Sequence, residues 1–403
     1  MRKAGLYIHI PFCLQKCNYC DFFSVQAGRF TDILSASGVS PFALRLMEDI
    51  KIQAKKYDVN EWDTVYIGGG TPSLLSPDDL YFISSQIIKE QKNPPAEFTV
   101  EINPEDLNKD FLTAAVHGGI NRFSVGIQSL SDEVLKECKR RGGRKTSLSA
   151  LGLLRSQKGL ILSCDLIAGL NNQTFEVLKD DIEILVNFKP EHFSLYALCS
   201  NTKISSEKDD EIAALWSYGK GILEQNGYNK YEVSNFSYKN LYKSIHNEKY
   251  WRLQDYIGVG PGAFGTVFFD KSTPPEYSST HAHAQALAYA HAYALRFSAC
   301  KNITKWMQCK NRDDVYEYET IAEKEFIEEA FMMGLRLTEG MDRAFFKSRF
   351  GKDITAFAGK TILKWADRNE AVLTDKSFYL NEKGFTYLNI FLQEVFQEID
   401  TMF

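Results

Sequence analysis

The sequence predicts an α/β protein: a partial (β/α)6 barrel of the TIM type, followed by a small α-rich C-terminal domain. Three observations lead to this fold class. Six β-rich runs alternate with amphipathic stretches over the first two-thirds of the 403 residues, and a helix between successive strands is the crossover that a parallel sheet needs. Six units are fewer than the eight of a closed barrel, so we expect an open one. The alternation stops after about residue 265.

The strand and helix candidates follow one another regularly along the chain. The strands are expected at residues 6–10, 64–67, 98–102, 122–127, 160–166 and 192–198. The helices are expected at residues 41–57, 77–91, 107–116, 131–139, 146–156 and 175–186. The run 160–167 is interpreted as apolar on both faces, as a sheet covered by helices requires.

Small or polar residues stand where the first four strands end. Cys13 follows the first strand and residues 68–71 follow the second. Glu101 closes the third strand and Gln128 follows the fourth. Because the C-terminal ends of parallel strands share one rim, and functional groups gather there in such folds, we expect these residues to meet.

The chain beyond the barrel is expected to contain mainly helices. They are expected at residues 321–337, 343–350, 354–369 and 385–399, with a hairpin at 371–381. The predicted domains are residues 1–265 (barrel), 266–310 (connecting segment) and 311–403 (α-rich domain). The Ala- and His-rich stretch 280–296 is expected to form no strand and to be an insertion. Its His281 and His283 are interpreted as solvated residues rather than as metal ligands.

Composition narrows the class of protein. The formal net charge of −5 argues against a general nucleic-acid binder, which usually has an excess of basic residues. The longest apolar runs are shorter than a membrane span, and residues 1–5 enter a strand-like run without an apolar signal core. We therefore expect a cytoplasmic protein that does not span a membrane.

The eight cysteines are too few for a disulfide scaffold in a chain of this length. Five scattered ones are interpreted as small buried apolar residues: Cys138, Cys164, Cys199, Cys300 and Cys309. The other three, Cys13, Cys17 and Cys20, form C-x3-C-x2-C after the first strand. Three thiolates on one loop can ligate three irons of a [4Fe–4S] cluster and leave the fourth iron open. A zinc site is the alternative, although it would need a fourth Cys or His and none is nearby.

This spacing, with an aromatic residue before the last cysteine, resembles the radical S-adenosylmethionine (SAM) superfamily. The resemblance extends to further motifs in the same order: YIHIPFC at 7–13, GGGTP at 68–72, EINP at 101–104, SVGIQS at 124–129 and DLIAGL at 165–170. Together these motifs are similar to the oxygen-independent coproporphyrinogen III oxidase group over residues 5–265. The tail resembles the C-terminal domain of that group.

The resemblance implies that SAM chelates the open iron through its amino and carboxylate groups. The positions that match SAM-binding positions of the family are Tyr7, Tyr19, Gly69, Gly70, Thr71, Glu101, Gln128, Arg140 and Asp165. A carboxylate suits ribose hydroxyls or an ammonium group, an arginine suits a carboxylate, and a glycine lets the backbone approach a ligand closely. The alternative for Glu101 and Asp165 is a structural ion pair at the rim.

Two positions distinguish the branches of this group. The decarboxylating oxidases carry a fourth cysteine where this chain has Phe22. A heme-chaperone branch instead carries H-N-x-x-Y-W, which is present here as HNEKYW at 246–251. Imidazole is a common axial ligand of heme iron, so the resemblance implies that His246 binds heme and that heme is delivered to an acceptor protein.

The same resemblance implies further partners and leaves one alternative open. An electron donor such as flavodoxin or ferredoxin is expected, and in the family the cluster and SAM support heme transfer or formation of a homodimer. The alternative is an enzyme of porphyrin biosynthesis, a coproporphyrinogen III oxidase that decarboxylates two propionates to vinyl groups, for which Phe22 is the contrary observation. No residue is assigned a catalytic role.

Overall fold

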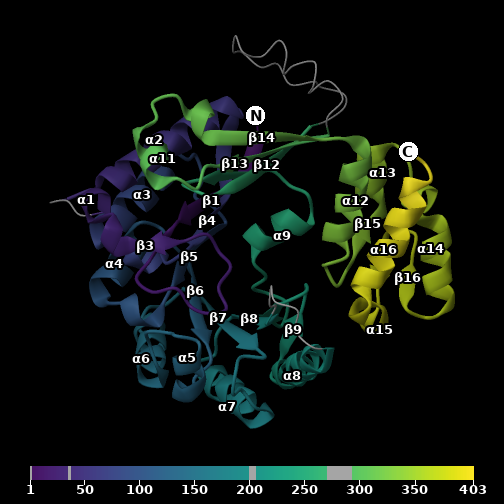
Figure 1. Cartoon of the computed structure of the whole chain (residues 1–403), viewed down its shortest axis with the longest axis horizontal. Coiled ribbons are helices and arrows are strands. Elements are labelled where there is room, and N and C mark those ends of the chain that lie inside the picture. Colours follow the sequence, from purple (N-terminus) through teal and green to yellow (C-terminus); the bar gives the residue numbers. More distant parts are fainter. Residues whose placement is uncertain (1, 35–37, 199–205, 270–292) are drawn as a thin grey trace.

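The largest part of the molecule is a curved sheet with helices on its outer face, shown in Figure 1 for the described residues 2–34, 38–198, 206–269 and 293–403 of this computed structural model. Its twelve described strands pair in the order β14-β13-β12-β11-β1-β4-β5-β6-β7-β8-β10-β9. The strands from β11 to β8 in this order are parallel, and those outside them are antiparallel. The predicted open α/β barrel is confirmed.

The six predicted strands form the centre of this sheet. They are β1 (Arg2–Ile10), β4 (Val59–Gly69), β5 (Glu97–Ile102), β6 (Arg122–Gln128), β7 (Ile161–Ala168) and β8 (His192–Ala197). The edge strands, which the sequence analysis missed, are β9 (Tyr228–Lys230), β10 (Asn235–Tyr238), β11 (Tyr256–Val259), β12 (Phe264–Phe268), β13 (Ala294–Ala299) and β14 (Tyr316–Ile321). A short pair, β2 (Phe12–Cys13) and β3 (Val25–Gln26), lies apart.

The sheet extends further along the chain than we expected. The predicted domain boundary at residue 265 falls inside β12, and β13 and β14 continue the sheet to Ile321. The expectation that 280–296 contains no strand is wrong for 294–296, which begin β13. Residues 270–292, with His281 and His283, lie outside the described residues.

Polar and apolar residues alternate along the central strands, and this alternation separates the two faces of the sheet. In β5, Phe98, Val100 and Ile102 are buried in the hydrophobic core under the helices. Thr99 and Glu101 alternate with them and point to the inner face, called the lumen below, because successive side chains of a strand point to opposite faces. The lumen of this barrel is therefore polar.

The interpretation of 160–167 as apolar on both faces is wrong for the same reason. In β7, Leu162, Cys164 and Leu166 belong to the core, whereas Ser163 and Asp165 lie on the lumen face, where the Ser163 hydroxyl donates a hydrogen bond to Asp165. This strand is therefore apolar on its helix side and polar on its lumen side.

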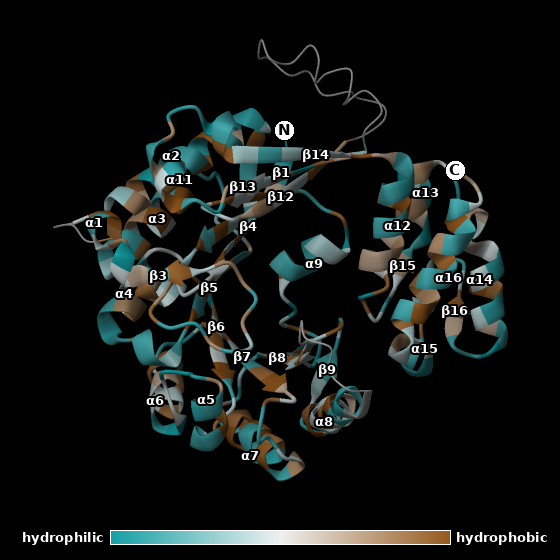
Figure 2. Cartoon of the chain, in the orientation of Figure 1, coloured by the Kyte–Doolittle hydropathy of each residue, from teal (hydrophilic) through white to brown (hydrophobic). Residues whose placement is uncertain are grey.

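The helices around the sheet are amphipathic, and Figure 2 shows hydrophilic and hydrophobic positions alternating along them. They are α1 (Thr31–Leu34), α2 (Pro41–Lys56), α3 (Pro77–Lys89), α4 (Lys109–His117), α5 (Asp132–Glu137), α6 (Arg144–Arg155), α7 (Phe175–Val186) and α8 (Ser206–Gln225). Ser40, Ser76, Asn108, Ser131 and Thr174 each accept a backbone N–H at a helix start, so side-chain capping fixes where these helices begin.

A short helix, α9 (Ile245–Trp251), lies inside the curve of the sheet (Figure 1). Its N-terminus is held by the buried carboxylate of Glu97, which accepts the N–H of Ile245 at 2.7 Å and the hydroxyl of Ser244 at 3.1 Å. Thr64 of β4 contacts the same helix. Because Glu97 begins β5, α9 covers the lumen toward the N-terminal ends of the strands.

The C-terminal domain packs around a second hydrophobic core, to which Leu253, Phe268 and Ala294 of the large sheet's part of the chain also belong. It contains α12 (Glu323–Gly334), α13 (Arg343–Phe350), α14 (Thr355–Asp367), α15 (Glu382–Thr386), α16 (Leu388–Asp400), and the strands β15 (Met341–Asp342), β16 (Ala371–Leu373) and β17 (Ser377–Leu380). The predicted helices and hairpin are present, and β15 adds a third strand to the hairpin. Helix α11 (Ile303–Gln308) lies between β13 and β14.

Two more expectations concern burial and membranes. Cys138 and Cys164 are buried as predicted, but Cys300 and Cys309 are only half-buried. These two stand just after β13 and α11, where they pack against the edge of the core and their sulfurs contact backbone carbonyls. Cys199 lies outside the described residues. In the part of the chain that the structure describes, we find no helix both long and apolar enough to cross a membrane.

Candidate functional site

A cavity of about 650 Å³ opens where the parallel strands end. The predicted site residues that line it are Cys13, Cys17, Cys20, Tyr19, Gly69, Gly70, Thr71, Glu101, Gln128, Arg140 and Asp165. Cofactor sites usually measure roughly 300–1,000 Å³, so the cavity is large enough for one. Tyr7 and His246 do not line it.

The loop that carries the three cysteines is tied to the segment after α5. The backbone N–H of Asn18 donates to the carbonyl of Cys138 at 3.2 Å, and the Gln15 amide donates to the carbonyl of Lys139 at 2.8 Å. These bonds hold the loop across the mouth of the cavity, where the three thiols are half-buried and free of disulfides.

The donor set of this loop fits an iron–sulfur cluster. Three thiols face the cavity, and Thr71 donates its hydroxyl to the sulfur of Cys13 at 3.3 Å. Among the described residues, we find no group of three or more His, Cys, Asp or Glu side chains that could hold a metal ion as they are placed. Soft thiolate ligands that leave one position open suit a cubane cluster and not a four-coordinate zinc.

Gly69 and Gly70 are constrained by neighbouring residues of the protein. A Cβ on Gly69, whose φ is +115°, would lie 2.6 Å from the ring of His9, and one on Gly70 would lie 2.8 Å from the carbonyl oxygen of Phe12. We predicted glycines here because a ligand approaches the backbone. The structure gives a second reason, which is that β4 ends tightly against β1 and the cysteine loop.

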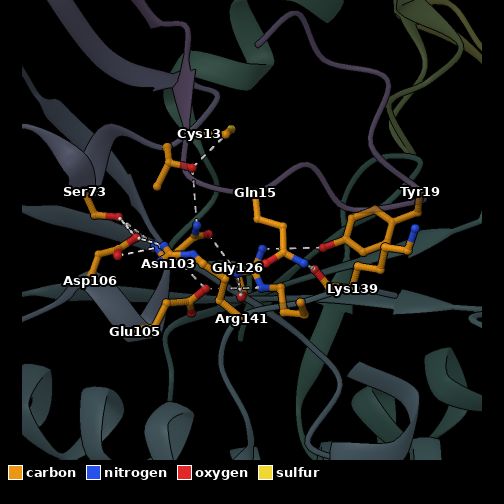
Figure 3. A network of polar contacts seen from close by, with 12 residues as sticks. Cys13, Gln15, Tyr19, Ser73, Asn103, Glu105, Asp106, Gly126, Lys139 and Arg141 are labelled. Carbon is orange, nitrogen blue, oxygen red and sulfur yellow. Dashed lines mark hydrogen bonds and ion pairs between the residues drawn. The ribbon is translucent and has the colours of Figure 1, made fainter. Parts of the chain in front are cut away.

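Figure 3 shows a network of polar contacts around Asn103, and Arg140 belongs to this network through its bond to Asn103. The guanidinium of Arg140 donates to the Asn103 side-chain oxygen at 2.7 Å and to the carbonyl of Gly126 at 2.6 Å. The Asn103 amide in turn donates to Thr71 at 3.4 Å. Arg140 also lies 3.5 Å from the hydroxyl of Tyr19. The network therefore connects the cysteine loop to the ends of three strands.

Arg141 has a different role from its neighbour. It donates to both carboxylate oxygens of Asp106 at 2.7 Å and is more exposed than Arg140. This difference supports the choice of Arg140 among the three consecutive basic residues 139–141, since Arg140 is the one held within the lumen network.

Two half-buried carboxylates, Glu101 and Asp165, face the cavity. Glu101 accepts the hydroxyl of Tyr66 at 2.8 Å and the N–H of Gly69 at 3.1 Å, and burial raises its pKa to about 7. Asp165 accepts the hydroxyl of Ser124 at 2.6 Å, and burial raises its pKa as well. Neither forms an ion pair within the described chain, so both can accept further donors from a ligand.

Tyr7 lies behind the wall of the cavity. Its hydroxyl contacts Nδ1 of His9 at 2.9 Å, and Nε2 of His9 contacts the carbonyl of Phe23 at 3.0 Å. His9 is the ring against which Gly69 packs. Tyr7 therefore supports the loop and the glycine turn through His9.

His246 is fully buried in the lumen below the cavity. Its Nδ1 contacts the hydroxyl of Thr64 at 2.8 Å and its Nε2 contacts the hydroxyl of Tyr250 at 2.9 Å. The ring stacks on Tyr66 at a centroid distance of 5.3 Å. Burial lowers the pKa of His246 to about 3, so the imidazole is neutral. Both ring nitrogens are engaged inside the protein.

Phe22 stands at the edge of the cavity with 69% of its surface exposed. Further residues that sequence reasoning did not single out also belong to the site: Tyr66, Asn103, Glu105, Ser124 and Tyr196. Asn103 stands two positions after Glu101, and Tyr66, Ser124 and Tyr196 lie in β4, β6 and β8. The polar alternation of β5 to β8 was the signal that could have found them.

Comparisons with known families agree with this geometry. The model of the radical SAM superfamily matches residues 7–185, and that of the HemN C-terminal domain matches residues 321–387. Heme chaperone HemW of Lactococcus lactis subsp. lactis (strain IL1403) is 28% identical to this chain over 95% of the chain and 97% of the relative. Heme chaperone HemW of Escherichia coli (strain K12) is 34% identical over 66% of the chain and 70% of the relative.

One solved structure resembles the whole chain. It is described as coproporphyrinogen III oxidase (HemN) from Escherichia coli, a radical SAM enzyme, and it matches with a TM-score of 0.73 and 16% identity. The match covers 100% of this chain and 91% of that one. At this identity the likeness establishes the fold.

Proposed function

This chain belongs to the HemW family of the radical SAM superfamily, and from that premise we propose that it is a heme chaperone that holds a [4Fe–4S] cluster, SAM and heme. The observation that supports the cluster and SAM most strongly is the cavity. Three cysteines and eight of the nine predicted SAM residues come from separate segments of the chain and line one space of about 650 Å³.

In this proposal Cys13, Cys17 and Cys20 ligate the cluster. When bound, the cluster leaves one iron for the amino and carboxylate groups of SAM and can supply an electron to the sulfonium. The chain contributes the walls. The hydrogen bonds that the side chains of Gln15 and Asn18 donate to the segment at the end of α5 hold the cysteine loop over the strand ends.

The polar residues of the lumen orient SAM. Arg140 presents a guanidinium that is already positioned by Asn103 and the Gly126 carbonyl, so binding a carboxylate requires little reorganisation. Glu101 and Asp165 accept hydroxyl or ammonium donors. Because burial raises the pKa of both carboxyl groups, ligand donors that favour the ionised form bind more strongly as pH rises.

Heme is assigned to the H-N-x-x-Y-W motif at 246–251, with His246 as the ligand of the iron. The support is the family membership together with Phe22, which occupies the oxidase-type fourth cysteine position. His246 Nε2 contacts Tyr250 and Nδ1 contacts Thr64, so heme ligation requires one of these two bonds to break. Helix α9 has only seven residues, and a short helix can open locally at modest cost.

The alternative of a coproporphyrinogen III oxidase is not favoured. Four relatives that match over 95–97% of their own length are named heme chaperones, while the likeness to HemN at 16% identity shows the fold alone. We further propose that the protein works in the cytoplasm, receives electrons from a donor such as flavodoxin or ferredoxin, forms a homodimer and passes heme to an acceptor protein.

One anaerobic experiment tests the proposal. The protein is reconstituted with iron and sulfide, and absorption spectra are recorded with SAM, with heme and with coproporphyrinogen III. We expect an iron–sulfur band, a heme complex, and no protoporphyrinogen. The His246→Ala variant is expected to lose the wild-type heme spectrum, whereas His117→Ala, which removes a surface histidine at the end of α4, keeps it.

Three results would contradict parts of the proposal. Formation of protoporphyrinogen would make the protein an oxidase. A heme spectrum that is unchanged in His246→Ala would remove that residue as the ligand. A colourless protein that retains one equivalent of zinc after reconstitution would exclude the cluster.

A further inference from the structure

We infer that a buried series of hydrogen bonds through His192 connects the SAM cavity to helix α9. A ligand that binds Asp165 therefore stabilises α9. His192 is thus a positioning residue. The inference rests on the proposed function, because it takes SAM as the ligand of Asp165 and α9 as the helix that carries the heme motif.

Five residues form this chain of bonds. Ser163 contacts Asp165 Oδ1 at 3.1 Å and His192 Nδ1 at 2.8 Å. His192 Nε2 contacts the hydroxyl of Tyr231 at 2.9 Å, and the N–H of Ser244 contacts that same hydroxyl at 2.9 Å. Ser163, His192, Tyr231 and Ser244 are each at most 2% exposed. Water therefore does not compete for these bonds, and the low local dielectric strengthens them.

The residues at the two ends of this series, Asp165 and Ser244, fix the direction of every hydrogen bond in it. An ionised Asp165 can only accept, and the backbone N–H of Ser244 can only donate. Ser163 therefore donates to Asp165, and its oxygen accepts a proton on Nδ1 of His192. Nε2 of His192 then accepts the hydroxyl of Tyr231, whose oxygen accepts Ser244. This assignment, which follows from the network, satisfies every member.

This series of hydrogen bonds ends at the start of α9. Ser244 is the N-cap residue of that helix, and its hydroxyl accepts the N–H of Asn247 at 3.3 Å. The carbonyl of Tyr231 also accepts the N–H and hydroxyl of Thr338 at 3.0 and 3.1 Å. Thr338 follows α12 in the C-terminal domain. Tyr231 is thus a joint between the barrel, the motif helix and the C-terminal domain.

The same residues have a second arrangement, in which the hydrogen bond to the start of α9 is weaker. Burial lowers the pKa of His192, so its ring is neutral and has two tautomers. If Asp165 is protonated, Ser163 can donate to Nδ1 instead and the proton moves to Nε2. The oxygen of Tyr231 must then accept both His192 and Ser244, and its own hydroxyl loses its acceptor. These two arrangements are the discrete states that coupling between distant sites requires.

SAM is expected to favour the first arrangement. Its hydroxyl or ammonium donors stabilise the ionised form of Asp165, and burial otherwise raises the pKa of this carboxyl. When Asp165 is ionised, Ser163 donates to it and the first arrangement is kept. In that arrangement the hydroxyl oxygen of Tyr231 accepts only the N–H of Ser244. A seven-residue helix depends on its cap, because it is too short to be stable alone.

The test is hydrogen exchange of the amides of 245–251 in the anaerobic, cluster-loaded protein with and without SAM. We expect SAM to slow this exchange by about fivefold or more, the lower end of typical coupling. In Ser163→Ala we expect SAM to bind but to leave the exchange of α9 unchanged. Calorimetry with SAM is done on each variant to show that it binds.

A matched control removes an equivalent bond elsewhere. Ser129 is also fully buried and donates to a buried carboxylate, Asp181, at 2.6 Å. Ser129→Ala is expected to keep the effect of SAM on α9. Tyr231→Phe is the second variant, and it is expected to speed exchange in α9 even without SAM, because Ser244 loses its acceptor.

The outcomes separate the two claims. If the wild-type protein binds no SAM, the proposed function fails. If SAM binds and the exchange of α9 does not change, or if Ser163→Ala responds to SAM like the wild-type protein, the coupling through His192 is wrong and the proposed function is unaffected.

Discussion

At the scale of single residues, the turn after β4 is one of the tightest places near the cavity. A Cβ on Gly70 would lie 2.8 Å from the carbonyl oxygen of Phe12 and 3.0 Å from that of Ile10. Both neighbours are backbone atoms, so neither can rotate away. The cysteine loop and the GGGTP turn therefore depend on each other's position.

We predict that Gly70→Ala lowers the free energy of unfolding by about 1–3 kcal/mol, the usual cost of overpacking. Gly152→Ala is the control, because nothing lies within 4 Å of a Cβ at that position in α6. That variant is expected to gain up to about 1 kcal/mol from helix propensity. Chemical unfolding followed by circular dichroism measures both. Equal stability of the two variants would contradict the close packing at Gly70.

Glu101 gives the apo protein a pH dependence that can be isolated. Its pKa is about 7 in the folded protein and 4.5 when unperturbed. Between these values the folded state holds a proton that the unfolded chain has released. The contribution of Glu101 is therefore fully present below pH 4.5 and is lost as pH rises through about 7.

We predict that, over this pH range, the free energy of unfolding of the wild-type apo protein falls by on the order of 3 kcal/mol more than that of the Glu101→Gln variant. The measurement is the free energy of unfolding of both proteins from pH 4.5 to pH 8. Asp165 titrates in both proteins, so its direct contribution cancels in the difference. Parallel curves would contradict the raised pKa of Glu101.

Motifs identified residues of the cavity, but their surroundings were beyond sequence reasoning. The cysteine loop, the glycine turn and Arg140 are placed together because strand ends share a rim. His246 contacts Thr64, 182 positions earlier in the chain, and no local pattern reports such a pairing. The same is true of Asn103, whose distant partners Thr71, Ser73 and Arg140 come from two other segments.

At the scale of elements, a buried ion pair fixes the extension of the sheet to the barrel. Arg312, just before β14, donates to both carboxylate oxygens of Asp49 in α2 at 3.0 and 2.8 Å. Tyr316, the first residue of β14, donates its hydroxyl to the same carboxylate at 2.9 Å. These bonds connect two segments that are more than 260 residues apart.

We predict that Asp49→Asn lowers the free energy of unfolding by about 3–5 kcal/mol, because it leaves the buried guanidinium without its charge partner. Removing the exposed pair between Lys51 and Glu90 by Glu90→Gln is expected to cost less than about 1 kcal/mol. Urea unfolding of the two variants checks the prediction. A similar small loss in both would contradict the anchoring role of Asp49.

The six central strands were predictable because each is a run of β-forming residues followed by an amphipathic helix. The outer strands β9 to β14 were not, since they are three to six residues long. Their pairing, which is antiparallel except between β11 and β1, depends on neighbours in space. The domain boundary was misplaced for that reason. The change in pattern near residue 265 marks the end of the βα repeats, while the sheet continues to Ile321.

At the scale of the whole molecule, the two ends of the lumen have different tasks. The C-terminal ends of the strands form the cavity with the cysteines, and the opposite part of the lumen is filled by α9. Helix α12 of the C-terminal domain lies beside α9 (Figure 1). A ligand in the cavity and a ligand at the motif therefore act on the same polar interior.

The central claim is that one cavity holds both the cluster and SAM. The most direct measurement is electron paramagnetic resonance of the reconstituted, reduced protein with and without SAM. We predict a [4Fe–4S]⁺ signal whose shape changes when SAM is added, loss of the signal in Cys17→Ala, and retention in Cys300→Ala. A cluster signal that SAM leaves unchanged, or one that survives in Cys17→Ala, would contradict the claim.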